Sequence, residues 1–211
     1  AAFARFGVAG NEAAGVIETM FDDVPAALLE VKSVQDATLI RLAADRFEIV
    51  VPSHKAARIH EALRQHAEEA GPGIWEWLDI RAGVPWITPA TQEAFVPQMV
   101  NLDLIGGVSF SKGCYPGQEI VARAHYRGQV KQRTYLAHIE TESTPEPGDK
   151  LYSADMGEQS SGTIVNAAPS PGGGYDALAA IHMSSIEAGD VRWKAPGGAR
   201  LAFLPLPYDV P

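Results

Sequence analysis

Apolar and polar positions along the first eighty residues alternate between stretches of period two, which predict strands, and stretches with helical spacing. Strands are expected at 3–7, 38–42, 47–51 and 74–80. Helices are expected from Asn11 to Met20 and from Ser53 up to the stop signal Gly71-Pro72-Gly73. Asn11 and Ser53 are suitable N-cap residues for the two helices. The order strand, helix, strand, strand, helix, strand predicts a ferredoxin-like βαββαβ domain, a fold that hosts many functions and indicates none.

The remainder of the chain has a different pattern. Residues 81–110 combine several Pro and Gly turn signals with high apolar content, which predicts ordered connecting structure. The last eighty residues predict a small antiparallel β-barrel or sandwich, because short strand-like runs alternate with Pro- and Gly-rich turns. These strands are expected at 134–139, 150–152, 162–166, 177–181 and 201–204. The fold class is therefore α+β, divided into residues 1–82, 83–130 and 131–211.

Composition narrows the class of protein. With 211 residues, 46% of them hydrophobic, the chain is long enough to bury a substantial core. Its single cysteine cannot form an intramolecular disulfide, which favours a reducing compartment such as the cytoplasm and disfavours a metal cluster held by this chain alone. No apolar run reaches the length of a membrane span, so no membrane association is expected.

The charge is unevenly distributed. The net charge is −9, which disfavours direct RNA binding, yet residues 112–133 carry +4 and the remainder −13. This contrast favours a local anion-binding site on an acidic protein. Ordinary solvated charges on a helix remain the alternative.

The only cysteine, Cys114, lies in the stretch SKGCYPGQEIVARAHYRG at 111–128. Pro116 suits the first turn of a helix, which would bury Ile120, Val121 and Ala124 and would place Cys114 just before its N-terminus. Backbone N–H groups there favour anions, and Lys112 is close, so a reactive thiolate is chemically reasonable. On the same helix, Glu119, Arg123 and Arg127 would share one face, with Glu119 able to pair with Arg123.

Each of these residues also has a simpler interpretation. A lone cysteine is often just a buried residue. A cysteine–histidine hydrolase is possible in principle, but nothing pairs His125 or His138 with Cys114. Trp75 and Trp77 would share one face of the strand expected at 74–80, and either a core position or stacking on a planar ligand would explain them.

The string KGCYPGQEIVARAHYRG closely resembles the signature of YgfZ-type folate-binding proteins, which are related to the T protein, or aminomethyltransferase, of the glycine cleavage system. The run LDIRAGVP after Trp75, the run FVPQMVNLDLIGGVSF and the closing LPLPY also resemble that family, so the similarity extends over the whole chain. Family members are longer at the N-terminus. The chain therefore looks like a family member that lacks its N-terminal third.

The resemblance implies a three-domain ring that holds tetrahydrofolate, with the last domain a β-barrel. It also implies a role in the assembly or repair of iron–sulfur enzymes and, through them, in tRNA modification, with iron–sulfur client enzymes or assembly proteins as partners. Cys114 matches the functional thiol and Trp75 a folate contact. The cofactor contacts expected around the signature are Lys112, Gln118, Glu119, Arg123 and Arg127. Of the cations in this stretch, Arg123, Arg127 and Lys131 could neutralise the carboxylates of the glutamate tail of folate.

Two departures from the family pattern concern folate. The family's N-terminal region contributes part of the folate cavity, including an aspartate that T proteins use for methylene transfer. In this chain Arg81 stands where relatives usually carry an acidic residue. The leading hypothesis is a tetrahydrofolate-binding accessory protein for iron–sulfur enzymes. The alternatives are a tetrahydrofolate-dependent aminomethyl or methyl transferase, which needs a carboxylate near the folate nitrogen, and direct binding of tRNA by the basic stretch.

Overall fold

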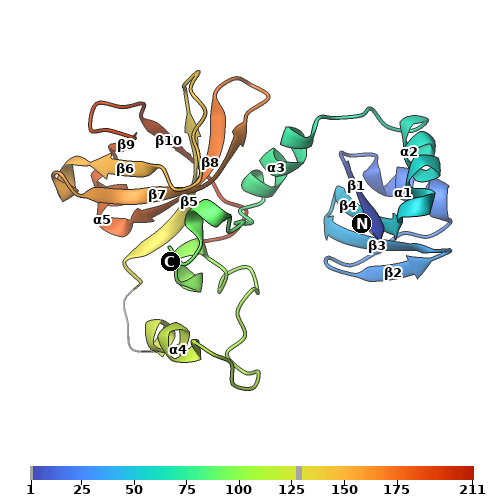
Figure 1. Cartoon of the computed structure of the whole chain (residues 1–211), viewed down its shortest axis with the longest axis horizontal. Coiled ribbons are helices and arrows are strands. Elements are labelled where there is room, and N and C mark those ends of the chain that lie inside the picture. The colour runs from blue at the N-terminus through green and yellow to red at the C-terminus, as the bar shows by residue number, and fades with distance from the viewer. Residues whose placement is uncertain (1, 127–129) are drawn as a thin grey trace. The chain divides into compact units, whose positions relative to one another are not determined.

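The computed structural model describes residues 2–126 and 130–211. The chain divides into two compact units, Ala1–Ala70 and Gly71–Pro211. Each unit combines helices with one antiparallel sheet (Figure 1). The fold is therefore a mixed α/β fold with two separate sheets, in agreement with the α+β class expected from the sequence.

The first unit has a four-stranded sheet in the order β1-β4-β3-β2. All of its strand pairs are antiparallel. Its elements are β1 (Phe3–Ala9), α1 (Ala13–Phe21), β2 (Val31–Val34), β3 (Ala37–Ala43), β4 (Arg46–Pro52), the 3-10 turn η1 (Ser53–Lys55) and α2 (Ala56–Arg64).

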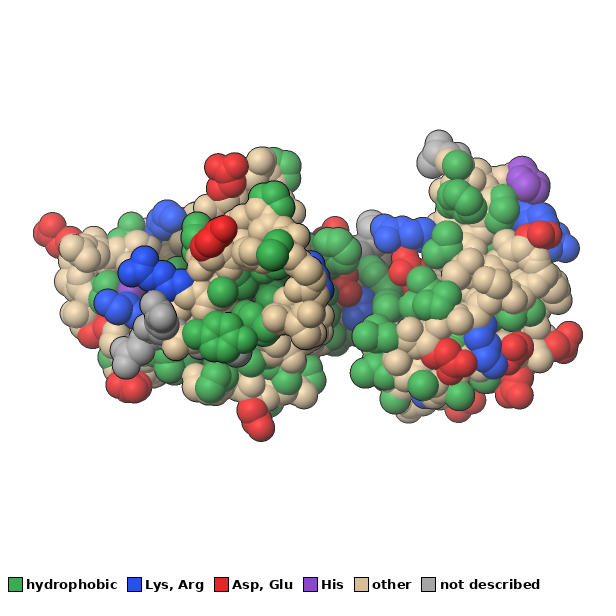
Figure 2. Space-filling model, turned by 90° about the horizontal axis from the view of Figure 1, so that it is seen from below, with side chains coloured by type: hydrophobic (Ala, Val, Ile, Leu, Met, Phe, Trp, Pro, Cys, Tyr) green, Lys and Arg blue, Asp and Glu red, His purple; other side chains and the backbone are tan. Residues whose placement is uncertain are grey.

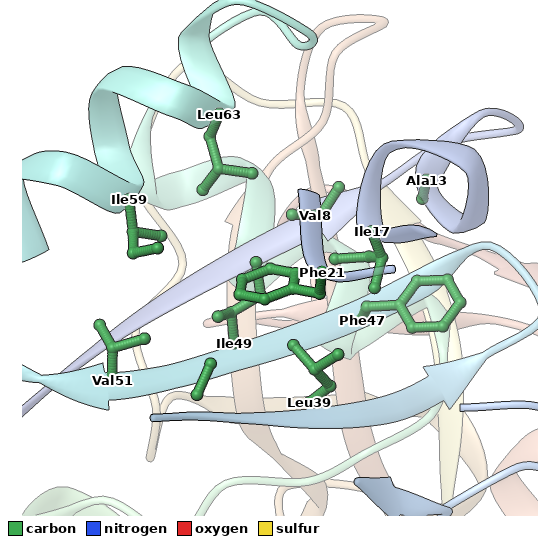
Figure 3. Close-up of a cluster of buried hydrophobic side chains, with 11 residues drawn as sticks. Val8, Ala13, Ile17, Phe21, Leu39, Phe47, Ile49, Val51, Ile59 and Leu63 are labelled. Atoms are coloured by element: carbon green, nitrogen blue, oxygen red, sulfur yellow. The ribbon is translucent and has the colours of Figure 1, made fainter. Parts of the chain in front are cut away.

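Both helices cover the same face of this sheet (Figure 3). Alternate residues of β3 and β4, among them Leu39 and Ile49, point toward Ile17 of α1 and Ile59 of α2. Leu39, Ile49 and Ile17 have no exposed surface. The apolar residues of period two in the strands thus pack with those of helical period in α1 and α2 to form one core, as burial of a single sheet face requires.

The strand expected at 74–80 is wrong, because these residues form helix α3 (Pro72–Arg81) in the second unit. Pro72 lies in the first turn, where its missing N–H costs nothing. Trp77 and Ile80, three residues apart, pack into one apolar cluster, so the helical period describes this segment better than period two does. The first unit consequently has three consecutive strands, and β2 was not expected.

The predicted helices of the first unit are confirmed, but the second ends at Arg64, before the predicted stop at Gly71. Neither predicted N-cap is confirmed. Glu12 occupies the N-cap position of α1 without a side-chain hydrogen bond, and η1 begins at Ser53 before α2 starts at Ala56.

The second unit has a six-stranded antiparallel sheet in the order β10-β5-β8-β7-β6-β9. The sheet curls as it passes from β5 to β6 (Figure 1). After α3, its elements are η2 (Pro89–Thr91), η3 (Pro97–Val100), α4 (Gln118–Tyr126), β5 (Gln132–Ile139), β6 (Lys150–Ser153), η4 (Ala154–Met156), β7 (Ser160–Pro169), β8 (Tyr175–His182), α5 (Met183–Ala188), β9 (Val191–Trp193) and β10 (Leu201–Leu204).

All five strands expected in the last eighty residues are confirmed, whereas β9 and α5 were not expected. Alternate residues of the sheet enter two different apolar clusters. Ile139 and Ile181 belong to one, and Leu136 and Leu178 belong to the other, together with Ile80 of α3. Helix α3 and the connecting segment therefore cover one face of this sheet. Within the described ranges, no helix is long and apolar enough to cross a membrane.

Candidate functional site

Cys114 lies in the segment that connects the 3-10 turn η3 to helix α4, and its side chain is exposed. The interpretation of this residue as an ordinary buried cysteine is therefore wrong. An exposed thiol is open to chemical partners in solution.

Local contacts hold the backbone next to this thiol. The Lys112 ammonium lies 4.6 Å from the centroid of the Tyr115 ring, a cation–π contact. The backbone N–H of Tyr115 donates to the side-chain carbonyl of Gln118 at 3.3 Å. Lys112 and Gln118, two of the predicted contact residues, thus bracket Cys114 on either side of a turn.

Helix α4 begins at Gln118, two residues after Pro116, and Gly117 precedes it with φ +84°. The prediction that Pro116 occupies the first helical turn is therefore wrong. The positive φ at Gly117 explains the later start, because such a conformation lies outside the helical region and glycine adopts it readily.

The helix buries Val121, half-buries Ala124 and leaves Ile120 62% exposed, so the predicted burial of Ile120 is wrong. Glu119 and Arg123 are exposed, as expected for one polar face. Among the described residues, no ion pair joins these two side chains. Arg127 lies outside the described residues. Figure 2 views the molecule from the side of α4, where hydrophobic and cationic side chains both reach the surface.

Side chains of the segment 97–103 form hydrogen bonds with both α4 and β5. Gln98 donates from its side chain to the carbonyl of Val121 at 2.7 Å, and Asn101 donates to the carbonyl of Thr134 at 2.7 Å. Asp103 accepts two hydrogen bonds from Arg133, at 2.7 and 3.0 Å, and both side chains are about nine-tenths buried. A bidentate buried pair of this kind fixes position as well as charge.

Gln98, Asn101 and Asp103 were not predicted to be positioning residues. Their signal was present as three polar positions inside an otherwise apolar run, FVPQMVNLDLIGG. Buried polar side chains are usually hydrogen-bonded, so polar residues in such a run indicate tertiary partners.

Trp75 and Trp77 do not share a face, because they lie two residues apart on a helix. Trp77 packs in the apolar cluster on β5 and β8, and its indole N–H donates to Asp176 at 2.8 Å. Trp75 is half-buried on another side of α3. Trp77 is thus a core residue, whereas the role of Trp75 as a ligand contact stays a prediction.

Arg81, which departs from the family pattern, lies at the end of α3 with its guanidinium 3.7 Å from the Asp176 carboxylate and 6.0 Å from the Trp77 ring centroid. The buried Asp176 also accepts from His138 at 2.8 Å. Arg81 therefore has a structural partner within its own unit.

His138 forms hydrogen bonds with Asp176 and Glu140. The side chain of His125 lies outside the described part of the chain. The contacts of His138 give no support to a cysteine–histidine hydrolase. Within residues 2–126 and 130–211, no group of three or more His, Cys, Asp or Glu side chains could hold a metal ion.

Three segments that carry the family resemblance meet in the second unit. Tyr208 of the closing LPLPY donates its hydroxyl to the carbonyl of Gly83 at 2.8 Å, and Asn101 lies 3.5 Å from the same hydroxyl. Burial raises the pKa of Tyr208. The AGVP turn, the 97–103 segment and the chain's last residues are thus packed together.

The structure does not bring all the predicted site residues together. Lys112, Cys114, Gln118 and Glu119 are grouped by chain proximity, with Arg123 one turn further along α4. Trp75 lies on α3, which packs against β7 and β8, whereas α4 contacts η3. The two helices occupy separate places in the unit (Figure 1).

Comparison with known proteins gives two kinds of match. The chain is 33% identical over 208 residues to the tRNA-modifying protein YgfZ of Yersinia pestis, covering 97% of this chain and 63% of that protein. The match to YgfZ of Pectobacterium atrosepticum is also 33% identical and covers 62% of that protein. The chain therefore spans less than two thirds of the length of these relatives. No protein-family model matches the chain.

Among solved structures, the chain is similar to the glycine cleavage system aminomethyltransferase T of Bartonella henselae. The TM-score is 0.66 with 16% sequence identity, over 96% of this chain and 58% of that one. At this identity the likeness concerns the fold alone.

Proposed function

Since the chain is homologous to the YgfZ proteins, we propose that it is a tetrahydrofolate-binding accessory protein that supports tRNA modification through iron–sulfur enzymes. The observation that carries this proposal is the match to YgfZ over 97% of the chain, a span that includes the segment around Cys114. The chain also shares its fold with aminomethyltransferase T. This likeness supports the proposal, because the family resemblance implies a folate site in that fold.

Within this proposal, both units belong to a folate-binding ring, and the curled sheet of the second unit is its C-terminal β-barrel. The N-terminal portion of the relatives, which this chain does not span, would complete the ring. Trp75 supplies a half-buried aromatic surface for the pterin or aminobenzoyl ring. The cations Arg123, Arg127 and Lys131 would neutralise the carboxylates of the glutamate tail.

The test of folate binding is a titration of the full-length protein with tetrahydrofolate, followed by tryptophan fluorescence. We expect saturable quenching in the wild type and about tenfold weaker binding in Trp75→Ala, since loss of an aromatic stacking partner costs ~1.4 kcal/mol. Trp86→Ala is the matched control, because Trp86 is 56% exposed on the loop after α3.

Equal affinities for wild type and Trp75→Ala would remove Trp75 from the site. An absence of quenching at millimolar tetrahydrofolate would overturn the folate proposal itself. In that case any function of the exposed Cys114 segment would not involve folate.

Cys114 is proposed to be the functional thiol that serves the client enzymes. Its support is the signature together with its exposure next to Lys112, which leaves the sulfur accessible to a partner. We expect Cys114→Ala to fail to restore iron–sulfur enzyme activity and tRNA thiolation in cells that lack the endogenous protein. Ser111→Ala, an exposed neighbour in the same segment, should restore both. Full restoration by Cys114→Ala would contradict a role for the thiol.

A further inference from the structure

The sheet of the first unit ends at β1 on one side and at β2 on the other (Figure 1). An edge strand carries a row of N–H and C=O groups that can act as a template for a further strand. The strand expected at 74–80, which would have followed α2, is helix α3 of the second unit. Among the described residues, β1 therefore pairs with β4 alone.

Hydrogen bonds at the two ends of β1 show which of its backbone groups face outward. Ser53 donates its backbone N–H to the carbonyl of Ala2, and Gly10 donates to the carbonyl of Asp45. Bonded and non-bonded pairs alternate along an antiparallel ladder, so the even-numbered residues of β1 bond to β4. The odd-numbered residues direct their N–H and C=O groups away from the sheet: Phe3, Arg5, Gly7 and Ala9.

This edge lacks the features that usually prevent strand addition, which are prolines, bulges, unpaired charges and short length. Its seven residues include no proline and pair with β4 without a register shift. Its one charged side chain, Arg5, already forms an ion pair with Glu48 at 3.2 Å. The opposite edge differs, because β2 has four residues and includes Lys32. Of the two edges, β1 is thus the one open to another strand.

The sequence of β1 is suited to pairing with itself. In an antiparallel pair around a two-fold axis at Phe6, Arg5 of each copy would lie opposite Gly7 of the other, and Phe3 opposite Ala9. These are the residues whose backbone groups face outward, so about eight backbone hydrogen bonds would form. Two copies could therefore continue one sheet across the axis.

Side chains on both faces of such a pair are complementary. On the face that the helices leave open, Gly7 has no side chain and its neighbour on β4 is Glu48. Arg5 of one copy can therefore extend across Gly7 to Glu48 of the other. On the helix face, Phe6 would meet Phe6 of the second copy, an aromatic cross-strand pair. The other neighbour of this ring is His60 of α2, with the two ring centroids 6.1 Å apart.

We propose that two copies of the protein associate through β1, which pairs antiparallel with its counterpart to form one continuous sheet. The backbone groups of the edge, the Arg5 and Glu48 charges and the Phe6 ring all find partners in the second copy. The proposal involves neither folate nor Cys114, so its failure would leave the proposed function untouched.

Sedimentation of the whole chain at about 1–500 μM tests this proposal, since weak interfaces dissociate in this range. We expect reversible dimerisation, with slower amide hydrogen exchange at Arg5 and Gly7 in the dimer. Gly7→Pro removes an outward N–H and should weaken the dimer about tenfold or more. Ser33→Pro is the matched control, because the N–H of Ser33 on β2 also faces outward, and it should leave the dimer unchanged.

A charge exchange separates contacts between copies from contacts within one copy. Arg5→Glu and Glu48→Arg should each weaken the dimer about tenfold, because each places like charges opposite one another across the axis. An equimolar mixture of the two variants should dimerise again, since the mixture restores opposite charges between copies but not within either. This test does not depend on the folding of Gly7→Pro.

A chain that stays monomeric over this range, a dimer insensitive to Gly7→Pro, or a mixture that stays monomeric would each overturn the proposal. The full-length protein provides a further test. If it is monomeric while the amides of Arg5 and Gly7 are protected from exchange, the N-terminal portion pairs with β1 in place of a second copy, and the proposal is wrong.

Discussion

Gly83 shows how one backbone position governs the packing of the chain's last residues. It has φ +69°, and a Cβ atom there would lie 2.6 Å from the Tyr208 ring and 2.8 Å from the Leu206 side chain. We expect Gly83→Ala to lower the free energy of unfolding of the second unit by about 1–3 kcal/mol, because of both the positive φ and the overpacking. Urea denaturation followed by tryptophan fluorescence measures this change.

Gly113→Ala is the matched control for this substitution. Gly113 has no heavy atom within 4 Å of an added Cβ and lies one residue from Cys114. The free energy of unfolding of the Gly113→Ala variant should be nearly unchanged from that of the wild type. Equal effects of the two substitutions would show that Gly83 is not under steric constraint.

Helix α3 is bound to its sheet by a small charged network, and this network makes stability depend on pH. Asp176 accepts from Trp77 and His138 and pairs with Arg81, while Glu140 lies near the other ring nitrogen of His138. The hydrogen bond to Asp176 raises the pKa of His138 above 6.5, although burial acts in the opposite direction. Glu140 adds to the increase.

A histidine whose pKa is higher in the folded state stabilises the fold when protonated. Its contribution is complete below the unfolded pKa of about 6.5 and is lost as pH rises through the folded value. We therefore expect the free energy of unfolding of the second unit to contain a component that decreases above neutral pH. The measurement is urea denaturation at a series of pH values.

His138→Gln should remove that component, whereas His66→Gln, which changes an exposed histidine of the first unit, should retain it. An unchanged pH profile in His138→Gln would show that the ring does not control the stability of this network.

At the scale of the whole molecule, the first unit has a core of its own. Leu39, Phe47 and Ile49 are completely buried within it. We expect a fragment of residues 1–70 to fold and to unfold cooperatively, although a domain of this size is only marginally stable. Circular dichroism and dispersion of the NMR spectrum test this expectation.

Leu39→Ala should destabilise the fragment by about 2–5 kcal/mol, which is comparable to the stability available to a small domain. In the whole chain, the same substitution should leave the unfolding transition of the second unit unchanged. A fragment 1–70 that is unfolded even without the substitution would contradict the independence of this unit.

The strands β4, β5 and β10 and the helices α1 and α2 could be predicted from the sequence, because each presents one consistent period. The residues 74–80 could not, because Ile74, Trp75, Trp77 and Ile80 satisfy both a strand and a helix pattern. Short elements such as β2 and β9 lacked a signal, since three or four residues are too few to show a period. The four-residue η3 was not predicted individually, because residues 81–110 were expected only to form ordered connecting structure.

For the candidate site, residue identity alone gives the family resemblance, the single thiol and the local excess of positive charge. Tertiary contacts, by contrast, place Cys114 at the surface, Trp77 rather than Trp75 in the core and Arg81 beside Asp176. Tertiary contacts also place Gln98 against α4, and Asn101 and Asp103 against β5. The physical reason is that burial and hydrogen bonding join residues far apart in the chain, such as Gly83 and Tyr208, and no local period records those contacts.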